Sequence, residues 1–154
     1  MNYQYLESPL GTLRIVSNGT ALTRIEFDGM HGSSDGMVER TDAALAAATA
    51  QLREYFEGNR TRFQLSLAPV GTDFQQQVWR ALGTIPYGEL RSYREIASSI
   101  GRARAVRAVG AANGRNPLPI VVPCHRVVGS DGSLTGFAGG LAAKQLLLEL
   151  EGAL

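Results

Sequence analysis

The sequence predicts an α+β protein: a small α/β N-terminal lobe, built from a strand meander and a helix, then a mainly helical C-terminal lobe with a helix-turn-helix. Two observations indicate this class. Apolar and polar residues alternate through the first third of the chain, whereas apolar spacings of three and four dominate the second half. A short segment containing Pro69 and Gly71 interrupts both patterns and predicts lobes at 1–68 and 73–154.

The N-terminal lobe is expected to begin with strands and to continue with a helix, because turn signals separate short alternating runs before a helical period starts. The predicted elements are strands at 3–6, 12–16 and 23–27, a flexible loop at 31–36, a helix from about Asp42 to a stop at Gly58, and renewed alternation at Phe63, Leu65 and Leu67.

The C-terminal lobe contains the pattern of a helix-turn-helix. Ser92 and Glu95 have the spacing of a capping box, so a helix is expected to begin at Ser92 and to stop at Gly101. A second helix from about Ala103 to Asn113 follows after a very short turn. Two short helices joined in this way are typical of the motif.

Positive charge is concentrated in the second lobe. Residues 73–154 carry nine Lys and Arg against six Asp and Glu, while residues 1–72 carry six Arg against eight acidic residues. Within 87–129 there are seven arginines and two glutamates. This span favours an anionic partner, nucleic acid first, although a solvated basic face fits the charge equally well.

The remaining composition excludes several classes of protein. One cysteine excludes an internal disulfide framework, and with two histidines beside it the chain lacks the usual ligands of a closed zinc site. No apolar run is long enough to span a membrane, and the first residues lack the features of a secretory signal. We therefore expect a cytoplasmic protein with no membrane partner, no metal and no cofactor.

The only cysteine, Cys124, lies in a segment suited to a nucleophile. Three of the six prolines stand between Asn116 and Cys124, so this stretch is stiff and cannot be helical. A thiol attacks as thiolate, which requires a base or a positive charge, and His125 and Arg126 follow directly. Neighbours on an extended segment point to opposite sides, so contact between Cys124 and His125 requires a turn or a bridging water. A buried inert cysteine beside a structural histidine is the alternative.

The residues around the cysteine resemble a known family. Pro123-Cys124-His125-Arg126-Val127-Val128 matches, residue for residue, the active-site signature of the methylated-DNA–protein-cysteine methyltransferases, which repair O6-alkylguanine. The first lobe resembles the family's N-terminal domain only in length and element order. Further matches along the second lobe, in the family's order and spacing, are Gly88, Ser92-Tyr93, Arg107 to Gly110, Asn116-Pro117, Gly136 to Gly140 and Glu151-Gly152.

The resemblance implies a suicide DNA-repair enzyme, a methylated-DNA–protein-cysteine S-methyltransferase that acts once. Cys124 matches the residue that accepts the alkyl group by in-line displacement, and His125 matches the base that takes the thiol proton through a water. Glu151 matches the carboxylate that orients this histidine, although alone it would be a surface charge at a helix end. Asn116 resembles the asparagine that braces the active-site turn, although it could equally be a simple turn residue.

The resemblance also implies base flipping from double-stranded DNA, because a buried thiol cannot reach a stacked guanine. Arg107 matches the arginine finger that fills the vacated stack. Tyr93 matches the tyrosine that donates a proton to the guanine ring and crowds the target's phosphate. Ser92, Ala105 and Gly110 are expected at the DNA as well. Helix packing is the commoner use of small residues on a helix, but it does not explain an arginine among them.

The pocket for the flipped base is expected to involve Asn116, Val127, Phe137, Ala138 and Gly139, with Phe137 stacked on the base. Some family members carry tyrosine and serine where this chain has Phe137 and Ala138. A side-chain hydroxyl contact to the base is then unavailable here, which leaves the tolerance for bulky alkyl groups open. The zinc-site residues of some relatives are also lacking, so no metal is expected.

Three other functions compete with this interpretation. A damage-recognition module without turnover would lack the cysteine, and a thiol hydrolase would leave the arginine-bearing helix unexplained. A helix-turn-helix regulator would need polar base-reading residues where the second helix offers mostly Ala, Val and Gly. The expected partner is duplex DNA containing O6-alkylguanine, bound by a monomer with little sequence preference. O4-alkylthymine as a substrate and cooperativity on DNA are left open.

Overall fold

A four-stranded sheet forms the N-terminal unit, Met1–Val70, of the computed structural model, which describes residues 1–154. The spatial order is β3-β2-β1-β4, in which β1, β2 and β3 are antiparallel neighbours and β4 is parallel to β1. The predicted meander is confirmed, and β4 is an edge strand that the alternation did not indicate. The strands are β1 (Asn2–Ser8), β2 (Gly11–Ser17), β3 (Leu22–Glu26) and β4 (Val38–Glu39).

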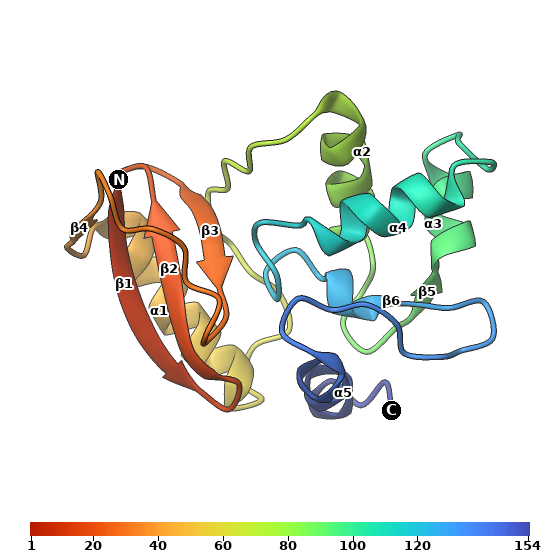
Figure 1. Ribbon diagram of the computed structural model, residues 1–154. Coiled ribbons are helices and arrows are strands. Elements are labelled where there is room, and N and C mark those ends of the chain that lie inside the picture. The colour runs from red at the N-terminus through yellow and green to blue at the C-terminus, as the bar shows by residue number, and fades with distance from the viewer. The chain divides into compact units, whose positions relative to one another are not determined.

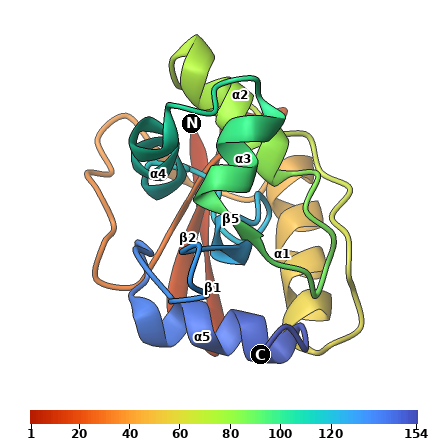
Figure 2. The ribbon, with the colours of Figure 1, turned by 90° about the vertical axis from the view of Figure 1, so that its right-hand side faces the viewer.

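Helix α1 (Ala43–Phe56) covers one face of this sheet (Figures 1 and 2). It begins where predicted, because the Asp42 side chain accepts a hydrogen bond from Leu45 N and so caps the first turn. It ends before Gly58, whose φ of 79° is the left-handed conformation that glycine adopts without strain. Leu45 and Leu52 are fully buried beneath it. Each such side chain stabilises the unit by about 2 kcal/mol.

The loop between β3 and β4 crosses the opposite face of the sheet (Figure 1). Arg14, almost completely buried, holds it there: Nε donates to Glu26 Oε1 at 2.8 Å, Nη1 to Ser34 Oγ at 2.7 Å and Nη2 to Gly32 O at 2.7 Å. The guanidinium also lies over the Tyr3 ring, 5.4 Å from its centroid. The predicted loop at 31–36 is therefore fastened to the sheet.

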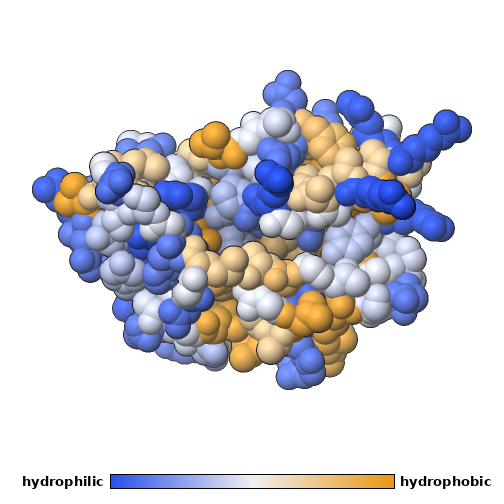
Figure 3. Space-filling view, in the orientation of Figure 1, coloured by the Kyte–Doolittle hydropathy of each residue, from blue (hydrophilic) through white to orange (hydrophobic).

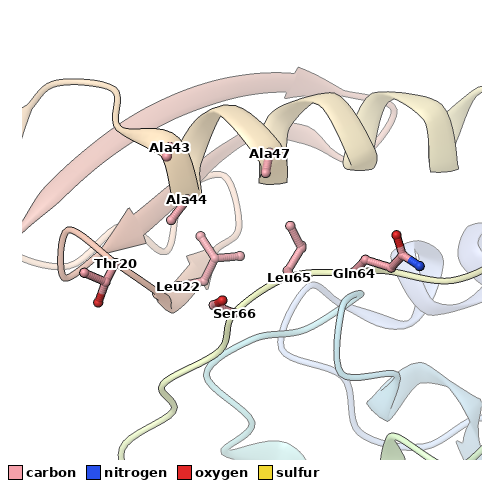
Figure 4. A pocket seen from close by; sticks show the side chains of 8 residues that line it. All are labelled: Thr20, Leu22, Ala43, Ala44, Ala47, Gln64, Leu65 and Ser66. Carbon is pink, nitrogen blue, oxygen red and sulfur yellow. The ribbon is translucent and has the colours of Figure 1, made fainter.

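The renewed alternation after α1 does not produce a strand. Only Leu67 pairs with the sheet, in a single bridge to Leu22. The Gln51 side chain on α1 accepts a hydrogen bond from Gln64 N at 2.9 Å and donates one to Gln64 O at 3.1 Å. These bonds replace those that a neighbouring strand would make. A hollow of about 210 Å³ lies beside this segment (Figure 4) and contains no titratable side chain. Its lining residues are Thr20, Leu22, Ala43, Ala44, Ala47, Gln64, Leu65 and Ser66.

The C-terminal unit, Gly71–Leu154, is mainly helical, as predicted. Helices α2, α3 and α4 pack on one another, and Trp79 Nε1 of α2 donates to Ala112 O of α4 at 2.9 Å. Both ribbon views place the short β5–β6 pair between the α3–α4 helices and α5 (Figures 1 and 2). The elements are α2 (Asp73–Leu82), β5 (Arg91–Ser92), α3 (Tyr93–Ser99), α4 (Val106–Gly114), the 3-10 turn η1 (Cys124–Arg126), β6 (Val127–Val128) and α5 (Leu141–Leu150).

The helix-turn-helix differs from its prediction at one boundary. The capping box of Ser92 and Glu95 is present in both directions and starts α3. Helix α4 begins at Val106 rather than near Ala103, because Ala105 N donates to Arg102 O in a separate turn and Ala105 has φ −95° and ψ 31°. No side chain caps α4, so the longer turn has no local signal in the sequence. None of the chain's helices is long and apolar enough to cross a membrane.

Candidate functional site

The segment that leads to Cys124 is a succession of tight turns. Val122 N donates to Leu118 O at 2.9 Å, and Cys124 N donates to Val122 O at 2.8 Å across Pro123. The chain then turns through η1, which consists of Cys124, His125 and Arg126. The turn that an interaction between Cys124 and His125 requires is therefore present.

Asn116 fastens these turns. Its Nδ2 donates to Val122 O at 2.8 Å, and its Oδ1 accepts from Leu118 N at 2.9 Å. Between these contacts Ile120 is buried with a φ of 75°, the only positive value in the chain outside glycine. A β-branched residue in this region is strained by about 1–3 kcal/mol. The surrounding contacts therefore hold the turn in a conformation that Ile120 alone would not adopt.

The Cys124 thiol is buried, with 4% of the residue exposed. Burial raises the pKa of Cys124 to about 11, while a hydrogen bond from Asn116 and the positive charge of Lys144 act in the opposite direction. The thiol is consequently protonated at neutral pH and becomes a nucleophile only when a neighbouring group removes its proton.

His125, the next residue of η1, is the candidate for that group. The residue is fully buried, and its Nε2 lies 2.7 Å from Glu151 Oε2. Since the Glu151 carboxylate accepts, Nε2 carries the hydrogen, and Nδ1 has no hydrogen-bond partner in the protein. Burial lowers the pKa of His125 below its usual value, although Glu151 opposes this. The imidazole is therefore neutral at pH 7, with the lone pair of Nδ1 available for a proton.

Glu151 is the hub of the site. In addition to His125, its carboxylate accepts from Arg126 Nε at 2.8 Å, from Arg126 Nη2 at 3.0 Å and from Gly88 N at 3.1 Å. Arg126 is buried, also donates to Ile85 O at 2.6 Å and lies over the Tyr87 ring. The sequence indicated Arg126 as a possible cation for the thiol, but Arg126 forms its ion pair with Glu151 instead. Glu151 is buried at the end of α5 and is not a surface charge.

Lys144 is a site residue that the sequence analysis missed. It lies on α5 and is fully buried, and its Nζ donates to Val127 O at 2.6 Å and to Thr135 O at 2.7 Å. Burial lowers the pKa of Lys144 to about 8. A signal existed: Lys144, Leu147 and Leu148 share the three- and four-residue spacing of the helix's buried face.

The β5–β6 pair brings the entrance of the helix-turn-helix to the cysteine segment. Arg91 pairs with Val127, and Ser92 with Val128, in parallel register. Tyr93 follows directly, and its hydroxyl accepts from Thr135 Oγ1 at 3.1 Å. Val127 is fully buried. Ser92, Tyr93 and Val127 therefore share one region with the carbonyl groups that Lys144 holds.

The remaining predicted residues lie on α4 and on the loop before α5. Arg107 is exposed in the first turns of α4, Ala105 directly precedes the helix, and Gly110 faces the Tyr93 ring. Hydrophilic side chains project from part of the C-terminal unit (Figure 3). The exposed arginines of α3, the turn and α4 are Arg94, Arg102, Arg104 and Arg107. In the loop, Phe137 and Gly139 are half-buried and Ala138 is exposed.

The site can do nucleophilic chemistry with its own residues. It joins a buried thiol, a neutral imidazole base and an ionised carboxylate in the unit that contains the helix-turn-helix. Nowhere in residues 1–154 do three His, Cys, Asp or Glu side chains come together as a metal site. These features define a class: helix-turn-helix proteins with a buried cysteine followed by a histidine–glutamate pair.

Comparison with known proteins narrows this class. The family described as 6-O-methylguanine DNA methyltransferase, ribonuclease-like domain, matches residues 1–69, and its DNA binding domain matches residues 73–153. The methylated-DNA–protein-cysteine methyltransferase of Methanosarcina barkeri is 48% identical over 155 residues, which cover 98% of this chain and 97% of the relative. The protein of that name from Mycobacterium tuberculosis is 48% identical over 152 residues, 98% of this chain and 92% of the relative.

Solved structures agree with these relatives. The crystal structure of Mycobacterium tuberculosis OGT in complex with DNA has a TM-score of 0.93 and 48% identity, and covers 99% of this chain and 94% of its own. The chain belongs to the 6-O-methylguanine DNA methyltransferase family.

Proposed function

We propose that this protein repairs O6-alkylguanine in double-stranded DNA by moving the alkyl group irreversibly to Cys124, once per molecule. One observation carries the proposal: a neutral His125, oriented by the ionised Glu151, directly follows the buried Cys124 in η1, within the unit that contains the helix-turn-helix. Family membership supports the same reaction, since the relatives are named for methyl transfer from DNA to a protein cysteine.

The reaction is a displacement at saturated carbon. The proton of the Cys124 thiol passes to His125 Nδ1, through a water, and the thiolate attacks the alkyl carbon in line with its bond to guanine O6. The carbon–oxygen bond breaks, a carbon–sulfur bond forms, and guanine leaves with the electron pair. Tyr93 is proposed to supply a proton to the leaving base. The thioether is stable, so the molecule does not recycle.

The residues around Cys124 and His125 are proposed to orient these two side chains and to set their protonation. Glu151 keeps the Nε2–H tautomer of His125 and so leaves Nδ1 as the base. Asn116 holds the turn that aims Cys124, which reduces the entropy lost on reaching the transition state. Val127, Phe137, Ala138 and Gly139 are proposed to form the pocket of the flipped base with Asn116.

DNA binding is assigned to the C-terminal unit, 73–154. Arg107 is proposed to fill the space of the flipped nucleotide from α4, with Ser92, Ala105 and Gly110 close to the backbone. The exposed arginines provide contacts to phosphate, which carry no sequence information, so binding should weaken with salt. The lobe at 1–68 is proposed as a separate α/β domain.

The proposed location of the protein is the cytoplasm. O4-alkylthymine is a candidate second substrate.

The test is the intact mass of the protein after incubation with a duplex that carries one O6-methylguanine. The expected result is the addition of one methyl group per molecule, with none on an undamaged duplex and none for Cys124→Ser. Tight binding of the lesion without any gain in mass would replace repair by damage recognition. A gain of mass in Cys124→Ser would place the acceptor elsewhere.

A further inference from the structure

Lys144 has an unusual place among the cations of this chain. It is the only lysine, the other cationic side chains being arginines, and it is fully buried. Its two hydrogen bonds go to carbonyl oxygens of Val127 and Thr135, which are neutral. A buried ammonium is costly unless a negative charge accompanies it, so its retention at this position requires a reason.

We propose that Lys144 is a positioning residue of the transfer reaction, whose charge balances the Cys124 thiolate while its carbonyl contacts fix the loop beside the thiol. The inference rests on the proposed function, because it concerns the same cysteine. It adds to the His125–Glu151 pair, which removes the proton and holds the resulting positive charge against the Glu151 carboxylate.

The charge balance of the site supports this assignment. Arg126 and Glu151 form a two-point ion pair and cancel each other. His125 is neutral in the resting protein, since burial lowers its pKa. Transfer of the thiol proton to His125 creates an imidazolium whose charge faces Glu151, so Lys144 is the one positive charge near the thiolate without an anionic partner. The titratable groups of the site are His125 and Arg126 on η1, Lys144 on α5, Glu151 at the C-terminal end of α5, Tyr87 beside Arg126 and Tyr93 beside Thr135.

The contacts of Lys144 place it beside the reacting segment. Val127 follows η1 directly, and its N–H donates back to Cys124 O. Thr135 belongs to the loop between β6 and α5, and its hydroxyl donates to Tyr93. One ammonium therefore joins the cysteine turn to that loop, and its charge lowers the pKa of Cys124 against the effect of burial.

The coupling has a defined pH range. Because burial lowers the pKa of Lys144 to about 8, the ammonium is charged below pH 8 and neutral above it. Linkage requires each charge to favour the other, so the thiolate is assisted only where Lys144 is protonated. Removal of the charge should therefore slow the reaction below pH 8 and matter little above it.

The experiment compares Lys144→Gln and Lys144→Met with the wild type. The readout is the rate at which iodoacetamide modifies Cys124, from pH 6 to 10, without DNA. Glutamine keeps a donor for the carbonyl groups and methionine keeps the volume, but both remove the charge. Both variants should react about tenfold more slowly at pH 7, for a rise of about one unit in the pKa of the thiol. The difference from wild type should disappear above pH 8.

Other outcomes would distinguish a purely structural role of Lys144 from an electrostatic one. A rate ratio that is constant with pH, or a Gln variant as fast as wild type beside a slow Met variant, would overturn the proposal in favour of loop positioning alone. Arg80→Gln, which removes an exposed charge from α2, should leave the rates unchanged. Thermal unfolding of each variant identifies those that do not fold.

A second measurement uses the fact that the chain has one lysine. Labelling with 15N-lysine yields a single side-chain signal, whose titration should have a midpoint near pH 8. A midpoint near 10.4, the value of a solvated lysine, would show that the charge is not buried and would overturn the proposal even if variants are slow. The methyl-transfer test with wild-type protein does not depend on either result. Failure of the proposed function can therefore be distinguished from failure of the proposal for Lys144.

Discussion

Each unit of the molecule contains an ion pair between a buried arginine and a glutamate, and the two pairs have different roles. Arg14 and Glu26 meet at 2.8 Å, and Arg126 and Glu151 at 2.8 and 3.0 Å. In both, the remaining guanidinium donors reach a loop carbonyl or hydroxyl, and a tyrosine ring lies beside the guanidinium. By the ion pair alone the two clusters are alike.

The difference is in what the carboxylate does next. Glu26 accepts a backbone N–H from Gly32 and so completes a structural anchor. Glu151 accepts a hydrogen bond from Nε2 of His125, the residue that follows the only cysteine. The other imidazole nitrogen, Nδ1, is buried and has no hydrogen-bond partner. An ion pair with a buried arginine is thus weak evidence of function, whereas a buried, unpartnered nitrogen on the residue that follows the only cysteine is strong evidence.

The largest expected effect separates the two glutamates by activity. Glu151→Gln should slow methyl transfer by about a thousandfold, because the carboxylate that orients the His125 base and stabilises its protonated form is lost. Glu26→Gln should transfer at the wild-type rate. Single-turnover rates on the O6-methylguanine duplex measure both, below the unfolding temperature of each variant. Similar rates for the two variants would remove Glu151 from the mechanism.

The two arginines should resemble each other in stability. Arg14→Met leaves Glu26 with only Arg24, at 3.9 Å, and removes the contacts to the loop, whereas Arg126→Met leaves the buried Glu151 without its cation. Each change should destabilise its unit by about 3 kcal/mol. Urea unfolding measures this, with Arg80→Met as the exposed control that should change little. Only Arg126→Met should also slow transfer. A loss below about 1 kcal/mol for either arginine would mean that the carboxylate becomes protonated or hydrated instead.

A smaller effect tests the strained turn in the active-site segment, which has no counterpart in the N-terminal unit. At Ile120, glycine should be more stable than alanine by about 1 kcal/mol, because only glycine adopts a φ of 75° without strain. At Val122, where φ is not positive, the order should reverse. Chemical unfolding of the four variants provides the comparison. The same order at both positions would argue against strain at Ile120.

The smallest effect concerns acid. Burial acts to raise the pKa of Glu26, but Arg14 and the Gly32 N–H outweigh it, so the folded pKa lies below the usual value. Glu26 therefore stabilises the fold above the unfolded carboxyl pKa of about 4.3, and this stabilisation is lost as pH falls through the folded pKa. The stability gap between wild type and Glu26→Gln should narrow on acidification below pH 4. Exposed Glu57→Gln should show no such gap at any pH.

The sequence by itself determined the local elements and indicated the candidate nucleophile. Asp42 and the Ser92–Glu95 pair cap helices through hydrogen bonds that span three residues, so their effect is legible in the chain. Gly58 ends α1 for an equally local reason. The signature around Cys124, with its prolines, indicated a stiff segment and a nucleophile. The class of fold followed from such short-range chemistry.

Tertiary structure decided what depends on distant partners and on burial. Arg126 pairs with Glu151, 25 residues away, and Lys144 reaches the carbonyl of Val127, 17 residues away, so neither role has a local pattern. The alternation from Phe63 to Leu67 does not form a strand, because a side chain of α1 makes the hydrogen bonds to the Gln64 backbone that a neighbouring strand would make. Protonation states were likewise decided in the fold: His125 is a neutral base because burial, which no single segment creates, makes its charge costly.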